Sequence, residues 1–393
     1  MAIARLREYS GPAILSYGFR PFFLAGGFYA GLGILIWLPF FFGIWRIPTA
    51  FTPVDWHIHE MLYGYLPAVI TGFLLTAIPN WTGRLPLQGR PLAILVLAWL
   101  VGRLAVFFSA DIGALAAAAV DLVFLVLVAF AAAREIVEGR NWRNLPPVGI
   151  LVLFGTGNAI FHFEAYAMGA ANFGIRIGIA AAIALITLIG GRVIPSFTRN
   201  WLSRRRSKTL PASFGLYDRV SIGVSALALA MWVAAPDSDV TGALMLSAAV
   251  MQFIRLGRWA GYQTLSDRLV LILHLGYFFV PIGFALISGS IFFPRQIPAS
   301  AGIHAWMAGA VGIMTLAIMS RASLGHTGRP LVANAMTQII YAAAFAAALT
   351  RICAALEPSR AAILLPMAAA FWVVAFCGFA LNYGPLLSRP RMI

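Results

Sequence analysis

Twelve apolar runs, each long enough to cross a lipid bilayer, constrain this chain more than any other feature of its sequence. A span needs about 20 apolar residues to cross roughly 30 Å of hydrocarbon, and 61% of the 393 residues are hydrophobic while 10% are charged. Because backbone groups must be satisfied inside lipid, these runs are expected to be helices. We therefore expect an all-α polytopic membrane protein in which residues 1–393 form a single integral membrane domain. The expected spans are 22–44, 58–79, 91–109, 112–133, 147–168, 174–194, 217–235, 239–257, 268–290, 298–320, 331–354 and 360–382.

Positive charge alternates between the connections of these spans. The formal net charge is +15, but the arginines gather in every second connection and are sparse in the others. Such an asymmetry marks the cytoplasmic side of a membrane protein, so we expect both the N-terminus and the C-terminus in the cytoplasm. The basic run at 204–208 then faces anionic lipid headgroups of the bilayer, and no nucleic-acid partner is expected.

The N-terminal residues and the cysteines exclude two further classes of protein. The apolar run after Pro21 is too long for a signal-peptide core, so no cleavable signal is expected. Cys353 and Cys377 lie on separate apolar helices, which excludes a disulfide framework. The charged residues before the first span are Arg5, Arg7, Glu8 and Arg20.

One sequence pattern occurs near both ends of the chain. The segments from His59 to Arg84 and from His304 to Arg329 have equal lengths (84 − 59 and 329 − 304 are both 25), and both end in Thr-Gly-Arg. A weaker third copy contains Thr198 but has Ile175 in place of the histidine. The copies fall on the second, sixth and tenth spans, which predicts three parallel units of four helices, arranged as a ring whose interior could hold a cofactor. The predicted units lie near 16–133, 147–257 and 268–382.

Four of the six histidines lie near the outer ends of the expected spans. His59 and His304 occupy the same place in the repeat, and two opposed imidazoles at one depth are what a six-coordinate b-type haem requires. We therefore interpret His59 and His304 as haem axial ligands. The alternatives are that they line a polar vestibule, that they bond backbone carbonyls, or that they bind a metal without haem.

His57 and His162 are candidates for a second metal centre. On a regular helix His57 points about 200° away from His59, and His162 lies late in the fifth span, which runs outward. Copper binds imidazole, so copper is the metal that we expect here, with hydrogen-bonded packing as the alternative. Glu60 is a secondary candidate, because a carboxylate can orient the second nitrogen of a ligating histidine or carry protons inward. The same two roles are open to Glu164, with an exposed interface residue as the alternative.

Three other residues are secondary candidates. His274, near the inner end of the ninth span, could contact an inner haem or a quinone, or it could be a buried histidine bonded to a neighbour. His326 and Arg329 are expected in the connection after the tenth span, in a structural or a phosphate-facing role. Arg103 and Asp121 are expected to pair between the third and fourth spans, because a lone charge inside a span is costly.

Five ordered motifs are spread over nearly the whole chain. They are Ser16–Phe23 (SYGFRPFF), Trp56–Met61 (WHIHEM), Ile78–Gly83 (IPNWTG), Gly191–Arg199 (GRVIPSFTR) and Arg321–Pro330 (RASLGHTGRP). Together these motifs resemble the NnrS family. The resemblance implies a twelve-span inner-membrane protein of bacteria that contains haem and copper. It also implies an association with nitric oxide metabolism, denitrification and resistance to nitrosative stress.

The three-by-four helix plan also resembles the haem-copper oxidases, whose haem histidines lie on the second and tenth helices. In this chain the sixth and seventh spans contain no histidine. A copper site of the oxidase type is therefore not supported, and the likeness concerns the fold alone.

Three functions remain open from the sequence. The first is an oxidoreductase that binds or reduces nitric oxide at an outer haem or haem–copper centre, with electrons from a quinol or a soluble donor. The second is a non-catalytic protein that binds or senses nitric oxide, haem or copper. The third is a secondary transporter, which twelve spans would suit. A transporter usually carries its polar residues near the bilayer midplane, whereas the histidines here gather at the outer end.

Overall fold

The protein is described by a computed structural model that covers residues 9–391. Arg5, Arg7 and Glu8, which we placed before the first span, lie outside this range. Within it, twelve helical segments are long and apolar enough to cross a membrane, and no residue forms a strand. The expected all-α polytopic class is therefore confirmed. The segments are Phe19–Phe41, Pro53–Thr82, Arg90–Phe107, Ala114–Glu138, Trp142–Met168, Phe173–Arg204, Leu216–Ala234, Asp239–Gln263, Arg268–Phe292, Ala299–His326, Ala335–Leu356 and Pro358–Ser388.

Each predicted span overlaps one of these segments. Where a helix begins or ends at a different residue from the predicted one, the cause is local. The second segment begins at Pro53, before the predicted start at 58, because Thr52 caps the helix by accepting a hydrogen bond from the Asp55 backbone nitrogen at 3.1 Å. Pro53 occupies the first helical turn, where proline lacks only a donor that the helix does not use. The sixth segment continues through Pro195 to Arg204, past its predicted end at 194.

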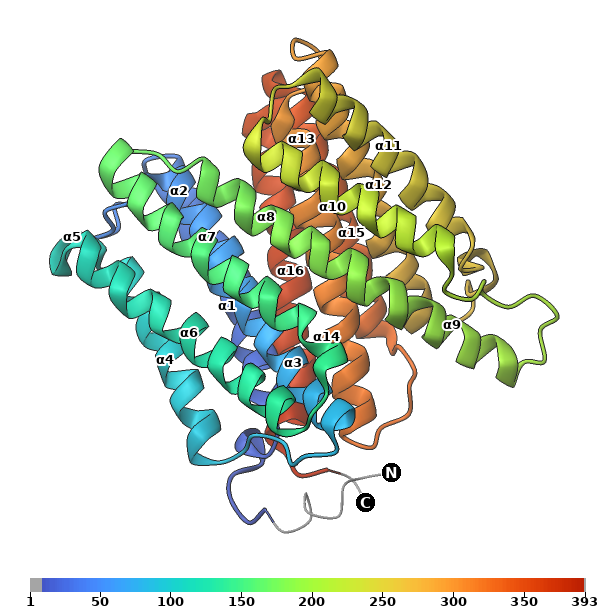
Figure 1. Cartoon of the computed structure of the whole chain (residues 1–393). Coiled ribbons are helices and arrows are strands. Elements are labelled where there is room, and N and C mark those ends of the chain that lie inside the picture. The colour runs from blue at the N-terminus through green and yellow to red at the C-terminus, as the bar shows by residue number, and fades with distance from the viewer. Residues whose placement is uncertain (1–8, 392–393) are drawn as a thin grey trace. The chain divides into compact units, whose positions relative to one another are not determined.

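Several segments are divided into shorter elements, as Figure 1 shows. The second, sixth and tenth segments each contain a π-helical stretch, named η3, η5 and η7. The elements of the first half are α1 (Phe19–Phe41), α2 (Pro53–His59), η3 (Glu60–Tyr65), α3 (Leu66–Thr82), α4 (Arg90–Phe107), α5 (Ser109–Ile112), α6 (Ala114–Glu138) and α7 (Pro146–Met168). Those of the second half are α8 (Phe173–Leu185), η5 (Ile186–Gly190), α9 (Gly191–Arg204), α10 (Leu216–Ala234), α11 (Asp239–Gly257), α12 (Arg268–Phe292), α13 (Ala299–His304), η7 (Ala305–Val311), α14 (Gly312–His326), α15 (Ala335–Leu356) and α16 (Ala361–Ser388).

The helices form two compact units, and the first contains α1 to α7. It comprises the described parts of residues 1–178, 319–330 and 376–393. Within it α1 packs on α3, α4 packs on α6, and α6 packs on α7. The Arg20 guanidinium donates to the carbonyl oxygen of Leu387 at 2.8 Å, so this buried arginine satisfies a carbonyl near the end of α16.

The second unit comprises residues 179–318 and 331–375. Within it α11 lies between α10 and α12, and α12 packs on α13 and η7. Helix α15 also packs on α13 and η7. The single membrane domain and the three four-helix units inferred from the sequence stay predictions.

Candidate metal centre

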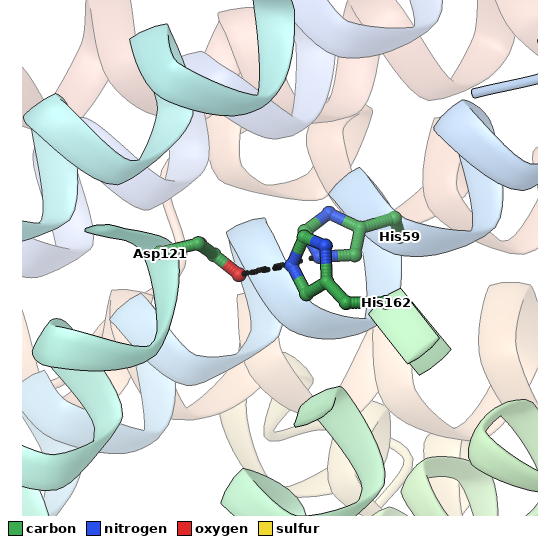
Figure 2. Close-up of side chains that lie close together, drawn as sticks. All are labelled: His59, Asp121 and His162. Atoms are coloured by element: carbon green, nitrogen blue, oxygen red, sulfur yellow. Dashed lines mark hydrogen bonds and ion pairs between the residues drawn. The ribbon is translucent and has the colours of Figure 1, made fainter. Parts of the chain in front are cut away.

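Three buried side chains from different helices meet inside the first unit. Nε2 of His162, on α7, lies 3.1 Å from Oδ2 of Asp121, on α6. Nε2 of His59, at the end of α2, lies 3.3 Å from the same oxygen. The two imidazole rings are 4.8 Å apart between centroids, and Figure 2 shows both rings directed at the carboxylate. The three residues therefore share one carboxylate oxygen as their common point.

The geometry of His59, Asp121 and His162 fits a metal ion. One ligand atom from each residue lies within 4.8 Å of the other two. With metal–ligand bonds of about 2.0–2.2 Å, the ligand atoms of a tetrahedral site lie about 3.2–3.6 Å apart, close to the distances that join Asp121 Oδ2 to the two imidazoles. Imidazole with carboxylate suits several transition metals, including copper, iron and zinc. The cluster could therefore hold a metal ion.

Glu60 and Arg103 surround this cluster. Nδ1 of His59 lies 2.9 Å from Oε1 of Glu60, so the carboxylate accepts the Nδ1 proton. Arg103 donates to the same Glu60 oxygen at 2.6 Å, and its other terminal nitrogen pairs with Asp121. The Tyr29 hydroxyl donates to Oε2 of Glu60. All the charged groups are buried, and two carboxylates against one guanidinium leave the network one negative charge in excess.

Asn158 places a further oxygen acceptor beside His59. Its amide nitrogen donates to Asp121 Oδ2 at 2.7 Å, and its Oδ1 lies 3.0 Å from His59 Nε2. In a neutral imidazole that donates through Nδ1, Nε2 carries a lone pair. That lone pair then faces two oxygen acceptors, Asn158 Oδ1 and Asp121 Oδ2. A positive charge at this point, a proton or a metal cation, would relieve the repulsion.

Aromatic side chains enclose the imidazoles. The Phe51 ring lies 5.2 Å from that of His59 and 5.4 Å from that of His162. The Phe161 ring also lies 5.2 Å from that of His59 and contacts the Phe51 ring at 5.5 Å. Tyr63 follows His59 by one turn and donates its hydroxyl to the Gly174 carbonyl at 2.6 Å. These aromatic rings make the surroundings of the two imidazoles apolar, which would favour a small uncharged ligand.

The π-helical segment η3 begins directly after His59 and shapes the local backbone. The indole nitrogen of Trp99, on α4, donates to the Gly64 carbonyl at 2.9 Å. A side chain at Gly64 would have its Cβ 2.6 Å from an Arg103 nitrogen and 2.9 Å from a Glu60 oxygen. Only glycine therefore allows Arg103 to reach Glu60 across this turn.

The structure places the other predicted ligands outside the cluster. The His57 ring is stacked on that of Trp37, at 4.1 Å between centroids. His304 ends α13 in the second unit and donates from Nδ1 to the Ser300 carbonyl at 2.7 Å. His59 belongs to the first unit, and the pairing of His59 with His304 on one haem stays a prediction. The same holds for copper at His57.

The secondary candidates take defined places. In the second unit, Nε2 of the buried His274 lies 2.8 Å from the Thr198 hydroxyl oxygen, which itself donates to the Ile194 carbonyl. His326 was expected in a connection, but it is the last residue of α14, because this helix runs beyond the predicted end at 320. Arg329 is exposed. The proposed roles of all three residues stay predictions.

The ring of His326 is stacked on that of Tyr17, 5.6 Å away. Tyr17 precedes the first span and is buried, and this burial raises the pKa of its phenol to about 12. The hydroxyl therefore stays protonated and donates to the Thr76 carbonyl at 3.4 Å. His326 thus packs in an aromatic contact inside the first unit, away from the cluster of His59, Asp121 and His162.

The predicted pairing of Arg103 with Asp121 is confirmed, whereas two functions of acidic residues were missed. Asp121 was not expected to receive two imidazoles. Glu164 was expected to orient a ligand, to carry protons or to be exposed. It is buried and accepts from the backbone nitrogens that begin α8, at 2.9 Å from Phe173 and Gly174. A signal for Asp121 exists in the sequence, because an aspartate in the middle of a span needs a partner.

The fold and the cluster define the class of this protein, which is a multi-pass all-helical membrane protein with a buried His/Asp/His group able to hold a metal ion. A family model described as NnrS protein matches residues 13–391 of the chain. The chain therefore belongs to the NnrS family, which confirms the resemblance found in its motifs. None of the curated proteins compared with the chain matches it.

Proposed function

We propose that this NnrS-family protein acts in nitric oxide metabolism and in defence against nitrosative stress, as a haem- and copper-containing protein of the bacterial inner membrane. The observation that carries the proposal is the shared Asp121 oxygen between two imidazoles, inside a network with one negative charge in excess. A bound redox metal supplies a coordination position for nitric oxide and a route for electrons. Nitric oxide is small and apolar, so it can arrive through lipid and pass the Phe51 and Phe161 rings.

The residues have distinct tasks in this proposal. His162 and Asp121 bind the metal, and Arg103 holds Asp121 in place. Glu60 accepts the Nδ1 proton of His59 and so presents Nε2 to the metal, in the manner of a carboxylate behind a ligating histidine. The contacts that position the ligands, from Arg103 to Asp121 and from Glu60 to His59, are already made in the structure.

His59 has two competing assignments, because its Nδ1 is engaged by Glu60 and only Nε2 is available to a metal. It either completes the cluster with Asp121 and His162 or binds haem iron opposite His304. His59→Ala separates the two assignments. Loss of non-haem metal, as in His162→Ala, assigns His59 to the cluster. Loss of the low-spin haem spectrum, as in His304→Ala, assigns it to haem.

The test of the proposal uses purified full-length protein in detergent. Copper, iron and haem are measured per polypeptide in the wild type, in His162→Ala and in the control His57→Ala, whose ring stacks on Trp37 outside the cluster. We expect His162→Ala alone to lose the non-haem metal. Equal metal content in the wild type and His162→Ala would refute the metal centre, and metal loss in His57→Ala would support the copper site predicted from sequence.

A second measurement separates turnover from binding. The protein is reduced with a quinol analogue, which supplies two electrons and two protons, and is mixed with nitric oxide without oxygen. Reduction converts two nitric oxide molecules, with these electrons and protons, into one nitrous oxide and one water. Nitrous oxide release identifies an oxidoreductase, and a stoichiometric spectral change without release identifies a binding or sensing protein. No change of either kind contradicts a role in binding nitric oxide.

A further inference from the structure

Arg351 carries a positive charge on the inward-facing side of a membrane-spanning helix. It lies on α15, seven residues after Ala344 and three after Ala348, both of which are buried. Ala355, one turn further, is buried as well. These spacings place Arg351 on the same stripe of the helix, and Arg351 itself is partly buried. Helix α15 packs on α13 and η7.

No carboxylate among the described residues of the second unit pairs with Arg351. The chain has no aspartate or glutamate between Asp267 and Glu357, and none after Glu357. Among the described residues, Arg351 forms no ion pair and no side-chain hydrogen bond. Glu357, at the end of α15, interacts with Ser359 instead. A guanidinium without a counter-charge is costly inside a span, so a group outside the polypeptide is expected to neutralise it.

The repeat that begins at His304 can be aligned with the one that begins at His59, and the alignment shows which charged groups near Arg351 have been lost. The shift from His59 to His304 is 245 residues (304 − 59). The same shift takes η3 onto η7, and it takes the starts of α4 and α6 to within two residues of those of α15 and α16. This agreement of element bounds supports the alignment of the two segments independently of the histidines.

The shift also aligns the charged residues of the first unit with positions in the second. Glu60 and Asp121 correspond to Ala305 and Pro366, so both carboxylates are lost. Arg103 corresponds to Ala348, one helical turn before Arg351. The later copy therefore keeps a guanidinium but lacks both groups that neutralise it in the first copy. In the first copy Arg103 reaches Glu60, which follows His59 directly. By this correspondence, Arg351 lies within about one turn of the level of His304 on the neighbouring helix.

We propose that Arg351 binds an oxyanion of a ligand held in the second unit beside His304. A guanidinium pairs with the two oxygens of a carboxylate or phosphate through parallel hydrogen bonds. The ligand must also be apolar, because the site lies within a span. Two sources meet these requirements, a carboxylate of haem and the phosphate of a tightly bound lipid. The haem source rests on the proposed function, in which His304 is a haem ligand, whereas the lipid source does not.

The test compares two substitutions of similar size. In Arg351→Gln the charge is removed, and in Arg351→Lys it is kept. Haem and co-purified phospholipid are quantified per polypeptide in both variants and in the wild type, after confirming that each variant is monodisperse. Loss of a charge-assisted pair predicts about tenfold weaker retention of the ligand in Arg351→Gln. Arg351→Lys is expected to retain most of it. The exposed Arg360 supplies the control, and Arg360→Gln should match the wild type.

The outcomes distinguish the sources and the two proposals. Loss of haem in Arg351→Gln identifies a haem carboxylate, and loss of phospholipid identifies a lipid phosphate. Wild-type protein without haem would contradict the haem part of the proposed function, yet loss of phospholipid in Arg351→Gln would still support the oxyanion site. Haem and phospholipid both at wild-type levels in Arg351→Gln would overturn the proposal for Arg351.

Discussion

Each unit contains a buried arginine with an acidic partner, and the two networks differ in their charge balance. In the first unit Arg103 lies between two carboxylates, Glu60 and Asp121. In the second unit Arg255 pairs with one carboxylate, Asp218, at 3.0 Å. Arg255 also donates to the hydroxyl of Tyr277 at 3.1 Å and to the carbonyl of Thr187 at 2.9 Å.

The comparison distinguishes a network that could bind a cation, around Arg103, from an ion pair that holds helices together, at Arg255. The buried pair of Arg255 and Asp218 is neutral, and the half-exposed Arg258 lies 4.0 Å from the other Asp218 oxygen. These contacts include no imidazole, and they hold α10, α11 and α12 to η5. The network of Arg103 has a negative excess and directs two imidazoles at one oxygen. A buried excess of charge is costly unless something compensates it. The first network therefore calls for one more positive charge, either a proton on His59 or a bound metal cation, and the second does not.

The largest effect is expected from removing the arginines. Arg103→Met leaves two buried carboxylates uncompensated, and breaking a buried pair typically costs about 3–5 kcal/mol. Arg255→Met leaves one carboxylate and should destabilise the protein less. The measurement is thermal unfolding of purified protein in detergent. The control is Arg134→Met, since Arg134 forms only a surface pair with Glu138. If Arg103→Met is as stable as this control, the charge comparison is wrong.

A smaller effect, on metal binding rather than on stability, is expected when the aspartate of each network is replaced by asparagine. Asp121→Asn removes the charge from the oxygen that both imidazoles approach, and metal affinity should fall by about 100-fold or more, beyond the loss typical of an outer partner. Asp218→Asn changes the neutral network and should leave the metal unaffected. Chelator competition measures both affinities. Equal metal retention in Asp121→Asn and Asp218→Asn would show that neither network holds the ion.

Glu60→Gln should weaken metal binding less than Asp121→Asn, because Glu60 acts through His59. An outer partner of a ligating histidine typically contributes about 10- to 100-fold in affinity. Chelator competition gives the metal affinity, and thermal unfolding shows whether the fold is kept. Should metal binding be unchanged in Glu60→Gln, the carboxylate would serve only to neutralise Arg103.

The smallest effect is expected from Tyr277→Phe in the second unit. The change removes the hydroxyl that accepts from Arg255 and donates to Gln252 at 2.7 Å. Loss of such hydrogen bonds costs about 1–2 kcal/mol of unfolding free energy. The thermal midpoint should fall while the metal content stays at the wild-type level. A lower metal content would indicate that the two networks are coupled.

Much of the fold could be predicted from the sequence, because the spans are long, apolar and separated by polar turns. The helix ends were less predictable. The cap at Thr52 and the continuation through Pro195 depend on local hydrogen bonds that composition does not reveal. The π-helical segments have no hydrophobic period of their own and were missed.

The candidate site was predicted in part. His59, His162 and Glu60 were singled out, and the pairing of Arg103 with Asp121 was expected from the cost of a lone charge. Their convergence could not be read from the chain, since His59, Asp121 and His162 are separated by 62 and 41 residues (121 − 59 and 162 − 121). Periodicity places a side chain on a face of its helix, but it does not say which other helix that face meets.

The segment η3 has a consequence for how the second span can vary. A π turn holds about one residue more than an α turn, so it accommodates one extra residue without rotating the rest of the helix. Deleting one residue between Glu60 and Tyr65 would restore a regular α turn and leave the residues beyond it facing as before. A deletion in α3 would instead rotate everything beyond it by about 100°, and His59 and the Thr-Gly-Arg end of the span would no longer face matching directions. The segment η3 is thus the place where this span can lose a residue without a change of facing.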